Sequence, residues 1–232
     1  MKIVILTGAG ISAESGVPVF RGPDGLWEGH RVEDVATPAA FAAHPALVHR
    51  FYNERRAKLL DPRIQPNAAH HALARLEREH PGDILLVTQN IDDLHDRAGS
   101  RHLLHLHGEL LKSRCTACGL VSPIRHDLSV DTPCPACRAT RSLRPHIVWF
   151  GEMPFHLDEI SAALSRADLF VSIGTSGNVY PAAGFVSLAA HAGARTLELN
   201  LDPSAASSSF HESRLGPATH LVPQWVDQIL SP

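Results

Sequence analysis

The sequence feature that most constrains the fold is an apolar segment that leads directly into a glycine-rich turn. Residues 1–6 read MKIVIL, which is typical of a short buried strand, and residues 7–16 continue as TGAGISAESG. A strand that enters a helix through a Gly-x-Gly-x-x-Ala turn is how a Rossmann-like sheet holds a dinucleotide. Gly8 permits the tight turn, Gly10 lets the backbone approach a pyrophosphate, and Ala13 lets the helix pack closely on the strand. Backbone N–H groups and the helix dipole would then face the phosphates, although a βα turn that binds no ligand remains the alternative.

The residues after this turn do not fit a conventional dehydrogenase. Such an enzyme places an acidic ribose-binding residue about 20 positions further on, at the end of a second strand. Residues 16–27 instead read GVPVFRGPDGLW, and the three Gly and two Pro in this segment predict a long loop. The loop carries Phe20, Arg21 and Trp27, as a loop that closes over a cofactor would.

The segment GAGISAESGVPVFRG closely resembles the nicotinamide-cofactor signature of the sirtuins, which are NAD-dependent protein lysine deacylases. Later segments extend the resemblance over nearly the whole chain. It implies that NAD is a consumed co-substrate, that no hydride moves, and that acylated lysines of proteins or peptides are the partners. The implied products are free lysine, nicotinamide and O-acyl-ADP-ribose.

Polar residues follow the next predicted strand, residues 83–87, as the run TQNIDDLH. Ligands bind at the carboxyl ends of strands in open α/β sheets, so this run is well placed, although a plain helix cap with Asp92 in the first turn is the alternative. In sirtuins the matching segment lies in the nicotinamide and ribose pocket. The resemblance implies that Asp92 holds the carboxamide, while Gln89 and Asn90 hold the ribose and an ordered water.

Two later strands are predicted at residues 168–173 and 196–199, and each precedes a segment suited to the same ligand. Residues 174–177 read as a second phosphate or ribose loop. By the resemblance, Asn200 falls where the adenosine ribose would lie, and Ala218 lies near the adenine end. The residues expected to bind NAD are Gly8, Ala9, Gly10, Ile11, Ser12, Ala13, Glu14, Phe20, Arg21, Trp27, Gln89, Asn90, Ile91, Asp92, Gly174, Thr175, Ser176, Asn200, Leu201, Asp202 and Ala218.

A candidate catalytic base lies in the segment HLHGE, predicted as a short strand that ends at Gly108. His105 and His107 are two apart and would share one strand face, but no nearby carboxylate or cysteine cluster completes a His-x-His metal site. Histidine is the side chain whose pKa best suits proton transfer near neutral pH. The sirtuin HGE motif implies that His107 is the base that deprotonates a ribose hydroxyl, that Asn90 assists catalysis, and that His105 is structural.

All four cysteines of the chain fall in one window, with the spacing Cys115-x₂-Cys118-x₁₅-Cys134-x₂-Cys137. This is the spacing of a zinc site in which two short knuckles each supply two thiolates to a tetrahedral ion. Two disulfides are the alternative, and the paired Cys-x₂-Cys spacing opposes it. Four thiolates leave no position for water, so the zinc is expected to be structural.

A predicted helix over residues 45–60 carries a candidate selectivity pair. Tyr52 and Arg55 are three apart and therefore share one helix face, whereas Arg56 points about 100° away from Arg55. Helix periodicity alone favours a packed Tyr and a solvated Arg. The pair matches the Tyr-x-x-Arg of the sirtuin branch that removes succinyl and malonyl groups, which implies removal of acidic acyl groups as well as acetyl.

The apolar stretch of residues 143–152 is predicted to end as a strand at Gly151, and such an edge could pair with an extended peptide. A core strand is the alternative. In sirtuins the matching stretch and the segment after the next glycine turn hold the acyl-lysine peptide between them. The residues expected to contact substrate are Tyr52, Arg55, Val148, Phe150, Gly151 and Val179.

Alternating strands and helices predict an α/β fold: a doubly wound, Rossmann-like parallel sheet with a small inserted domain made of a helical part and a Cys₄ zinc module. The NAD-binding domain is expected to span residues 1–27, 67–111 and 144–232, and the small domain residues 28–66 and 112–143. A net charge of −3 among 232 residues gives no support for nucleic acid as a partner. Without an apolar run of membrane-spanning length or an export signal, no membrane partner and a cytoplasmic location are expected.

Two other classes of function remain open on the sequence. An NAD-dependent oxidoreductase would need the ribose-binding acid that the Gly/Pro loop replaces. An NAD-sensing or zinc-ribbon binding module would need no histidine base and should present a basic face.

Overall fold

The computed structural model describes residues 1–19 and 29–231, and its main element is a six-stranded sheet. Its strands are β1 (Ile3–Thr7), β2 (Ile84–Thr88), β3 (Leu103–His105), β7 (Leu169–Ile173), β8 (Arg195–Asn200) and β9 (Glu212–Leu215). The order across the sheet is β3-β2-β1-β7-β8-β9, and neighbouring strands run parallel. The chain therefore builds outward on one side of β1 and then on the other, which is the doubly wound arrangement that the sequence predicts.

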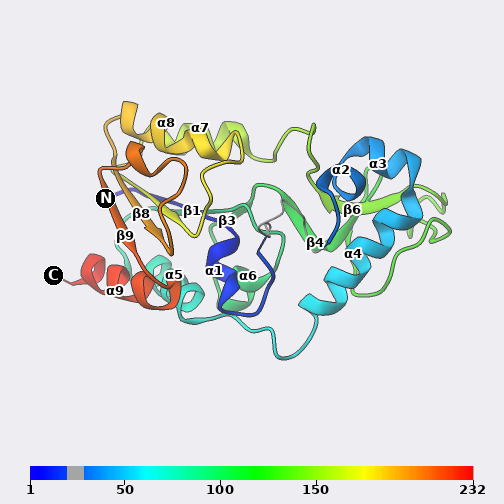
Figure 1. Cartoon of the computed structure of the whole chain (residues 1–232), viewed down its shortest axis with the longest axis horizontal. Coiled ribbons are helices and arrows are strands. Elements are labelled where there is room, and N and C mark those ends of the chain that lie inside the picture. The colour runs from blue at the N-terminus through cyan, green and yellow to red at the C-terminus, as the bar shows by residue number, and fades with distance from the viewer. Residues whose placement is uncertain (20–28, 232) are drawn as a thin grey trace.

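Helices cover both faces of this sheet (Figure 1). Helices α1 (Ala9–Ala13), α5 (Ala68–Glu79), α6 (Leu94–Ala98) and α9 (Ala218–Leu230) lie on one side, and α7 (Leu157–Leu164) and α8 (Phe185–His191) lie on the other. Successive side chains of a strand point to opposite faces. Accordingly, Ile3 and Ile5 pack into the cluster formed with α5 and α9, whereas Val4 and Leu6 pack into the cluster formed with α7 and α8.

A second, smaller part lies at the opposite end of the molecule from α9 (Figure 1). It consists of an antiparallel sheet in the order β5-β4-β6 and three helices that follow one another in the chain. These elements are β4 (Gly108–Cys115), β5 (Val121–Pro123), β6 (Leu143–Ile147), α2 (Val32–Val35), α3 (Pro38–Ala43) and α4 (Pro45–Leu59). Phe51 and Tyr52 of α4 pack against Leu110 of β4 and Ile147 of β6 in a separate core.

Several expected boundaries change in the structure. The predicted divisions at residues 111 and 144 fall inside β4 and β6, both of which belong to the small sheet. The single strand expected to end at Gly108 is divided in two, because β3 ends at His105 and β4 begins at Gly108 after a turn. Gly108 makes that turn with φ of +85°, a conformation that favours glycine.

Thr37, which precedes Pro38, and Asn67, which follows Pro66, predict helix N-caps from the sequence, and both caps are confirmed. Thr37 accepts a hydrogen bond from Ala40 N–H at the start of α3, and Asn67 accepts one from Ala69 N–H at the start of α5. The sequence predicts a terminal helix from about Val222 to Leu230, whereas α9 begins at Ala218 and contains Pro223. Strand β9 and the 3₁₀ turns at Ala182–Gly184 and Ser207–Ser209 are further elements that the sequence reading missed.

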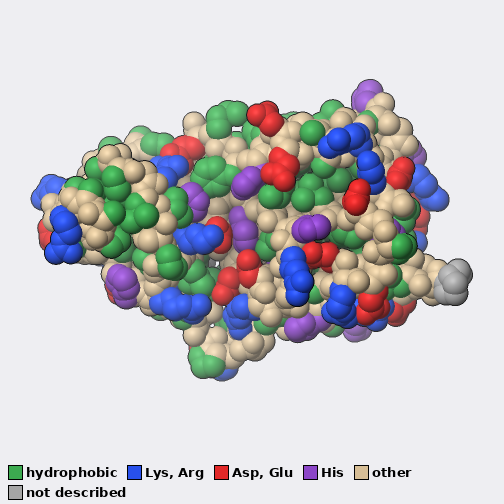
Figure 2. Space-filling model, turned by 180° about the vertical axis from the view of Figure 1, so that it is seen from behind, with side chains coloured by type: hydrophobic (Ala, Val, Ile, Leu, Met, Phe, Trp, Pro, Cys, Tyr) green, Lys and Arg blue, Asp and Glu red, His purple; other side chains and the backbone are tan. Residues whose placement is uncertain are grey.

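The surface carries charges of both signs. On the face shown in Figure 2, Lys and Arg side chains are interspersed with Asp and Glu side chains. Within the described ranges, none of the helices combines the length and apolarity that a membrane crossing requires.

Candidate active site

A cleft of about 660 Å³ opens at the carboxyl ends of the parallel strands and extends to α4 and to the segment after β6. It lies where the strand order reverses between β1 and β7, the position at which open α/β sheets bind ligands. The predicted residues that line it are Gly8, Ala9, Gly10, Ser12, Tyr52, Arg55, Gln89, Asn90, Ile91, Asp92, His107, Val148, Phe150, Gly151, Gly174, Thr175, Ser176, Val179, Asn200, Leu201 and Asp202.

The turns after β1 and β7 contact each other at the floor of the cleft. Gly10 N–H donates to the Gly174 carbonyl at 2.9 Å, and Gly8 N–H donates to the Ile173 carbonyl at 3.0 Å. A Cβ on Gly10 would lie 2.7 Å from Gly174 Cα, which no side chain tolerates without a shift of the backbone. These glycines therefore permit contact between the two turns, in addition to the expected approach of a pyrophosphate.

Four of the predicted NAD-binding residues are not among those that line the cleft. Ile11 is fully buried in the core, and Ala13 is exposed. Glu14 accepts hydrogen bonds from the backbone and hydroxyl of Thr219, and Ala218 packs partly buried against the large core. Their contact with NAD stays a prediction. Phe20, Arg21 and Trp27 lie outside the described residues.

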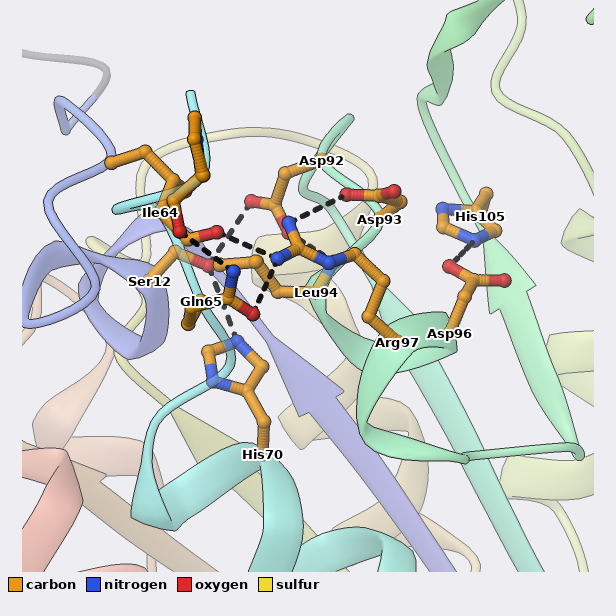
Figure 3. A network of polar contacts seen from close by, with 11 residues as sticks. Ser12, Ile64, Gln65, His70, Asp92, Asp93, Leu94, Asp96, Arg97 and His105 are labelled. Atoms are coloured by element: carbon orange, nitrogen blue, oxygen red, sulfur yellow. Dashed lines mark hydrogen bonds and ion pairs between the residues drawn. The ribbon is translucent and has the colours of Figure 1, made fainter. Parts of the chain in front are cut away.

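A buried polar network links the turn after β1 to the segment after β2 (Figure 3). The side-chain amide of Asn90 donates to the Gly8 carbonyl and to Ser12 Oγ, each at 3.1 Å. Ser12 in turn donates to Asp92 Oδ2 at 3.0 Å, and Leu94 N–H donates to Asp92 Oδ1 at 3.1 Å. Asn90 and Asp92 therefore bond to the turn after β1 as well as to the start of α6, which is more than a helix cap requires.

The carboxyl group of Asp92 is buried and poorly solvated. Its side chain is 7% exposed. Burial raises the pKa of Asp92 to about 6, although the bonds from Leu94 N–H and Ser12 act in the opposite direction. The carboxyl can therefore change its protonation state close to neutral pH, which is common for groups in functional clefts.

His107 lies in the turn between β3 and β4 with one ring nitrogen anchored. Its Nδ1 is 3.0 Å from the Gln89 carbonyl. Because a carbonyl only accepts, Nδ1 carries the proton, and Nε2 of the neutral ring is left as the basic atom. Burial lowers the pKa of His107, so the ring is neutral at pH 7 and able to accept a proton.

His105 does not line the cleft and has a different environment. Its Nε2 is 3.2 Å from Asp96 Oδ2 (Figure 3). Burial disfavours the charged ring, but the hydrogen bond and the negative charge of Asp96 outweigh it and raise the pKa of His105. This pairing is consistent with a structural role for His105. The two histidines, which were expected on one strand face, therefore have different environments.

Helix α4 brings the predicted selectivity pair to the cleft. Tyr52 is fully buried, and its hydroxyl oxygen accepts a hydrogen bond from Trp149 Nε1 at 2.9 Å. Arg55 is 7% exposed, donates to the Phe51 carbonyl at 2.7 Å, and holds its guanidinium over the Phe51 ring. The solvated arginine that helix periodicity favours is therefore wrong.

Another face of the same helix is directed toward the cysteine-bearing segment. Arg56 is 1% exposed and donates to the Leu110 carbonyl and to Asn53 Oδ1. Asn53 also exchanges two hydrogen bonds with the backbone of Leu128. Arg55 and Arg56 thus point in different directions, as helix geometry predicts. Asn53 and Arg56 join α4 by hydrogen bonds to β4 and to the segment that includes His126 and Leu128.

The four cysteines converge with geometry suited to one metal ion. Their sulfur atoms all lie within 4.8 Å of one another, and none is in a disulfide. The Cys115–Cys137 and Cys118–Cys134 sulfur pairs are 3.7 Å apart. Four thiolates at about 2.3 Å from a tetrahedral zinc are separated by about 3.8 Å, so the donor set fits zinc.

The predicted peptide-binding edge differs from the structure in one respect. Strand β6 ends at Ile147 and does not continue to Gly151. Val148 N–H instead donates to the His107 carbonyl, and Phe150 N–H donates to the Ala36 carbonyl. Residues 148–151 therefore join the turn that carries His107 to the small part and line the cleft without forming a strand.

Sequence reasoning did not single out some residues that line the cleft, among them Lys58, Trp149 and Glu152. Trp149 lies in the stretch assigned to substrate, but the pattern did not distinguish its side chain from those of its neighbours. A buried indole N–H needs a hydrogen-bond partner. That requirement is the only feature of the sequence that could have drawn attention to Trp149.

Comparison with known proteins is consistent with this geometry. Residues 8–181 match the model of the Sir2 family. The chain is 59% identical over 230 residues to the NAD-dependent protein deacylase SIR2rp3 of Trypanosoma brucei brucei, with coverage of 98% of this chain and 94% of that protein. It is 57% identical over 230 residues to an NAD-dependent protein deacylase of Pasteurella multocida, with coverage of 99% and 98%.

Solved structures agree with the sequence matches. A Sir2 homologue in complex with NAD superposes with a TM-score of 0.89 at 41% identity, covering 99% of this chain and 90% of that one. A Sir2 variant with a deacetylated peptide and 3′-O-acetyl-ADP-ribose superposes with a TM-score of 0.85 at 31% identity, covering 98% and 93%.

The first prediction concerns the metal. Cys134→Ser should lower the bound zinc to well below one ion per chain and cause misfolding or aggregation, because the cysteine segment has little apolar mass to fold without a metal. Elemental analysis together with thermal unfolding checks this. A variant that is metal-free, folded and as stable as the wild type would rule out a structural zinc.

The second prediction concerns Asp92. Since its pKa in the folded state, about 6, lies above its ordinary value of 3.8, the folded state binds the proton more tightly, and stability from this group is lost as pH rises through 6. Asp92→Asn removes the titration. Its free energy of unfolding relative to wild type should therefore rise by about 1 kcal/mol between pH 5 and pH 7.5. Urea denaturation at both pH values measures the difference, and an unchanged difference would contradict the assignment.

Proposed function

The chain belongs to the Sir2 family, and from this membership we propose that it removes acyl groups from protein lysines in a reaction that consumes NAD. The observation that carries the proposal is the cleft itself, where the two glycine turns, the Asn90–Ser12–Asp92 network and His107 meet at the switch point of the sheet. The NAD-dependent deacylases of Trypanosoma brucei brucei and Pasteurella multocida, each matched over nearly its full length, support it.

NAD supplies an electrophilic ribose carbon whose bond to nicotinamide breaks when the acyl oxygen attacks. The residues of this chain would hold the two halves of that molecule on opposite sides of the β1 turn. Gly8, Gly10 and residues 174–176 would accommodate the phosphates, and Asn200, whose amide donates to the Thr175 carbonyl at 2.7 Å, would lie beside the adenosine ribose. Asp92 would accept from the carboxamide of nicotinamide.

His107 would act as the general base. Its Nε2 is unprotonated at neutral pH, and the Gln89 carbonyl fixes the orientation of the ring. A ribose hydroxyl that has given its proton to this nitrogen can attack the acyl carbon. Asn90 would assist by placing an ordered water, and its own amide is held by Gly8 and Ser12.

Some of the acyl groups that the protein removes are proposed to be acidic. Arg55 can bind a carboxylate with two parallel hydrogen bonds, and the Tyr52 hydroxyl can donate a third. Both side chains line the cleft from a buried position on α4. A charged guanidinium in such a place is stabilised by an anionic ligand, so succinyl-lysine and malonyl-lysine are proposed as substrates alongside acetyl-lysine.

Three further statements remain proposals. The two parts of the molecule are proposed as an NAD-binding domain and a small helical and zinc-binding domain, with the boundaries moved to accommodate β4 and β6. The location is proposed as cytoplasmic, since unpaired thiols in a metal-binding cluster suit a reducing compartment. Neither nucleic acid nor a membrane is proposed as a partner.

The third prediction tests the reaction. His107→Ala should retain NAD binding and lose activity by about 10²–10⁴-fold, because a general base contributes by that order. Mass spectrometry of an acyl-lysine peptide incubated with NAD should show nicotinamide and O-acyl-ADP-ribose with the wild type and little of either with the variant. Production of NADH instead would support an oxidoreductase, and no turnover by the wild type would support a binding module.

A matched control is available for this experiment. His105→Ala removes a neighbouring histidine that is paired with Asp96 and does not line the cleft. It should lower the thermal stability while the folded fraction keeps most of its turnover. Equal losses of turnover in both variants at equal folded fractions would remove the special role of His107.

The fourth prediction concerns acyl selectivity. Arg55→Met should lower kcat/KM for a succinyl-lysine peptide more than tenfold, since a hydrogen bond to a charged group contributes about 1.5–3 kcal/mol. The effect on the paired acetyl-lysine peptide should be far smaller. Steady-state kinetics on both peptides decides the matter, and an equal loss on both would mean that Arg55 supports the fold or the NAD site.

A further inference from the structure

The hydroxyl of Tyr52 has a defined hydrogen-bond donor in the protein. Trp149 Nε1 lies 2.9 Å from the Tyr52 hydroxyl oxygen, and both residues are buried. Their ring centroids are 6.3 Å apart with the planes tilted by 33°. The contact joins α4 to the segment after β6, two parts of the chain separated by 97 positions.

Trp149 is itself held from several sides. The guanidinium of Arg144 stacks over its ring at 3.5 Å, and Phe41 lies 5.2 Å away, measured between ring centroids. Glu152 accepts two hydrogen bonds from Arg144, at 2.6 and 2.9 Å, and a third from Trp149 N–H at 2.8 Å. The Arg144–Glu152 ion pair, of which Arg144 is buried and Glu152 partly buried, therefore holds both the backbone and the ring of Trp149.

The chemistry of the two groups sets the direction of the phenol proton. An indole N–H can only donate, whereas a phenol oxygen accepts and donates. Tyr52 must accept from Trp149, so its own proton points away from the indole. The same oxygen becomes a better donor when it accepts a hydrogen bond, because neighbouring hydrogen bonds polarise one another.

We propose that Trp149, held by the Arg144–Glu152 ion pair, is a positioning residue for acyl selectivity that directs the Tyr52 hydroxyl proton toward a carboxylate in the cleft. The inference rests on the proposed recognition of acidic acyl groups by Tyr52 and Arg55. It assigns to the indole N–H an effect that acts through Tyr52 and that an acyl group lacking a carboxylate does not use.

A double-mutant cycle tests the proposal with Trp149→Phe, Tyr52→Phe and the combined variant. The quantity measured is the ratio of kcat/KM for succinyl-lysine to kcat/KM for acetyl-lysine on paired peptides. Trp149→Phe keeps an aromatic ring and removes the N–H, and it should lower this ratio about fivefold, as expected for one neutral hydrogen bond. In the Tyr52→Phe background the same change should lower the ratio by less than about twofold, because the hydroxyl on which it acts is absent.

The outcomes separate this inference from the proposed function. If Tyr52→Phe leaves the ratio unchanged, recognition of acidic acyl groups by this pair fails, and the inference fails with it. If Tyr52→Phe lowers the ratio but Trp149→Phe does not, or lowers it equally in both backgrounds, Trp149 does not act through Tyr52 and only the inference is overturned.

A second replacement covers the case in which Trp149→Phe fails to fold. Benzothienylalanine introduced at position 149 keeps the bicyclic shape and replaces the N–H with sulfur. It should lower the ratio about as much as Trp149→Phe, and a ratio equal to that of the wild type in this folded protein would overturn the proposal.

Discussion

The close contact between the turns after β1 and β7 is the constraint on which the rest of the site depends. Gly10 N–H donates to the Gly174 carbonyl, and a Cβ on either glycine would lie within 3.0 Å of the other turn's backbone. The contact fixes where the two halves of the sheet separate. Much of the polar lining of the cleft follows parallel strands whose positions depend on that junction: Asn90 and Asp92 after β2, His107 after β3, and Asn200 after β8.

The walls of the cleft contain ionisable groups in places that favour their uncharged forms. Asp92 and His107 both have pKa values moved by burial, upward for the acid and downward for the base. Such placement costs stability, and proteins retain it where chemistry requires it. Hydrogen bonds from Ser12 to Asp92 and from His107 to Gln89 limit that cost, and at the same time they fix the orientation of each group.

Short sequence patterns predict much of this arrangement. The rest depends on contacts between segments that are far apart in the sequence. The glycine turn, the Gln-Asn-x-Asp run, the caps at Thr37 and Asn67 and each Cys-x₂-Cys pair lie within a few residues, so a pattern can reveal them. The start of α9 at Ala218 depends on a contact between Glu14 and Thr219, which are 205 positions apart. The end of β6 depends likewise on bonds to His107 and Ala36, and the burial of Arg55 depends on tertiary packing that no periodicity contains.

The contacts on the two faces of α4 determine whether Arg55 or Arg56 lines the cleft. Tyr52 and Arg55 point to the cleft, while Asn53 and Arg56 bond to Leu128 and Leu110 on the side of the cysteines. Leu128 packs in the same cluster as Cys115 and Cys134. A turn of the helix by one residue, about 100°, would bring Arg56 toward the position of Arg55. The cysteine-bearing end of the molecule therefore fixes the rotation of α4 about its own axis, and contacts remote from the cleft determine which of two adjacent arginines lines it.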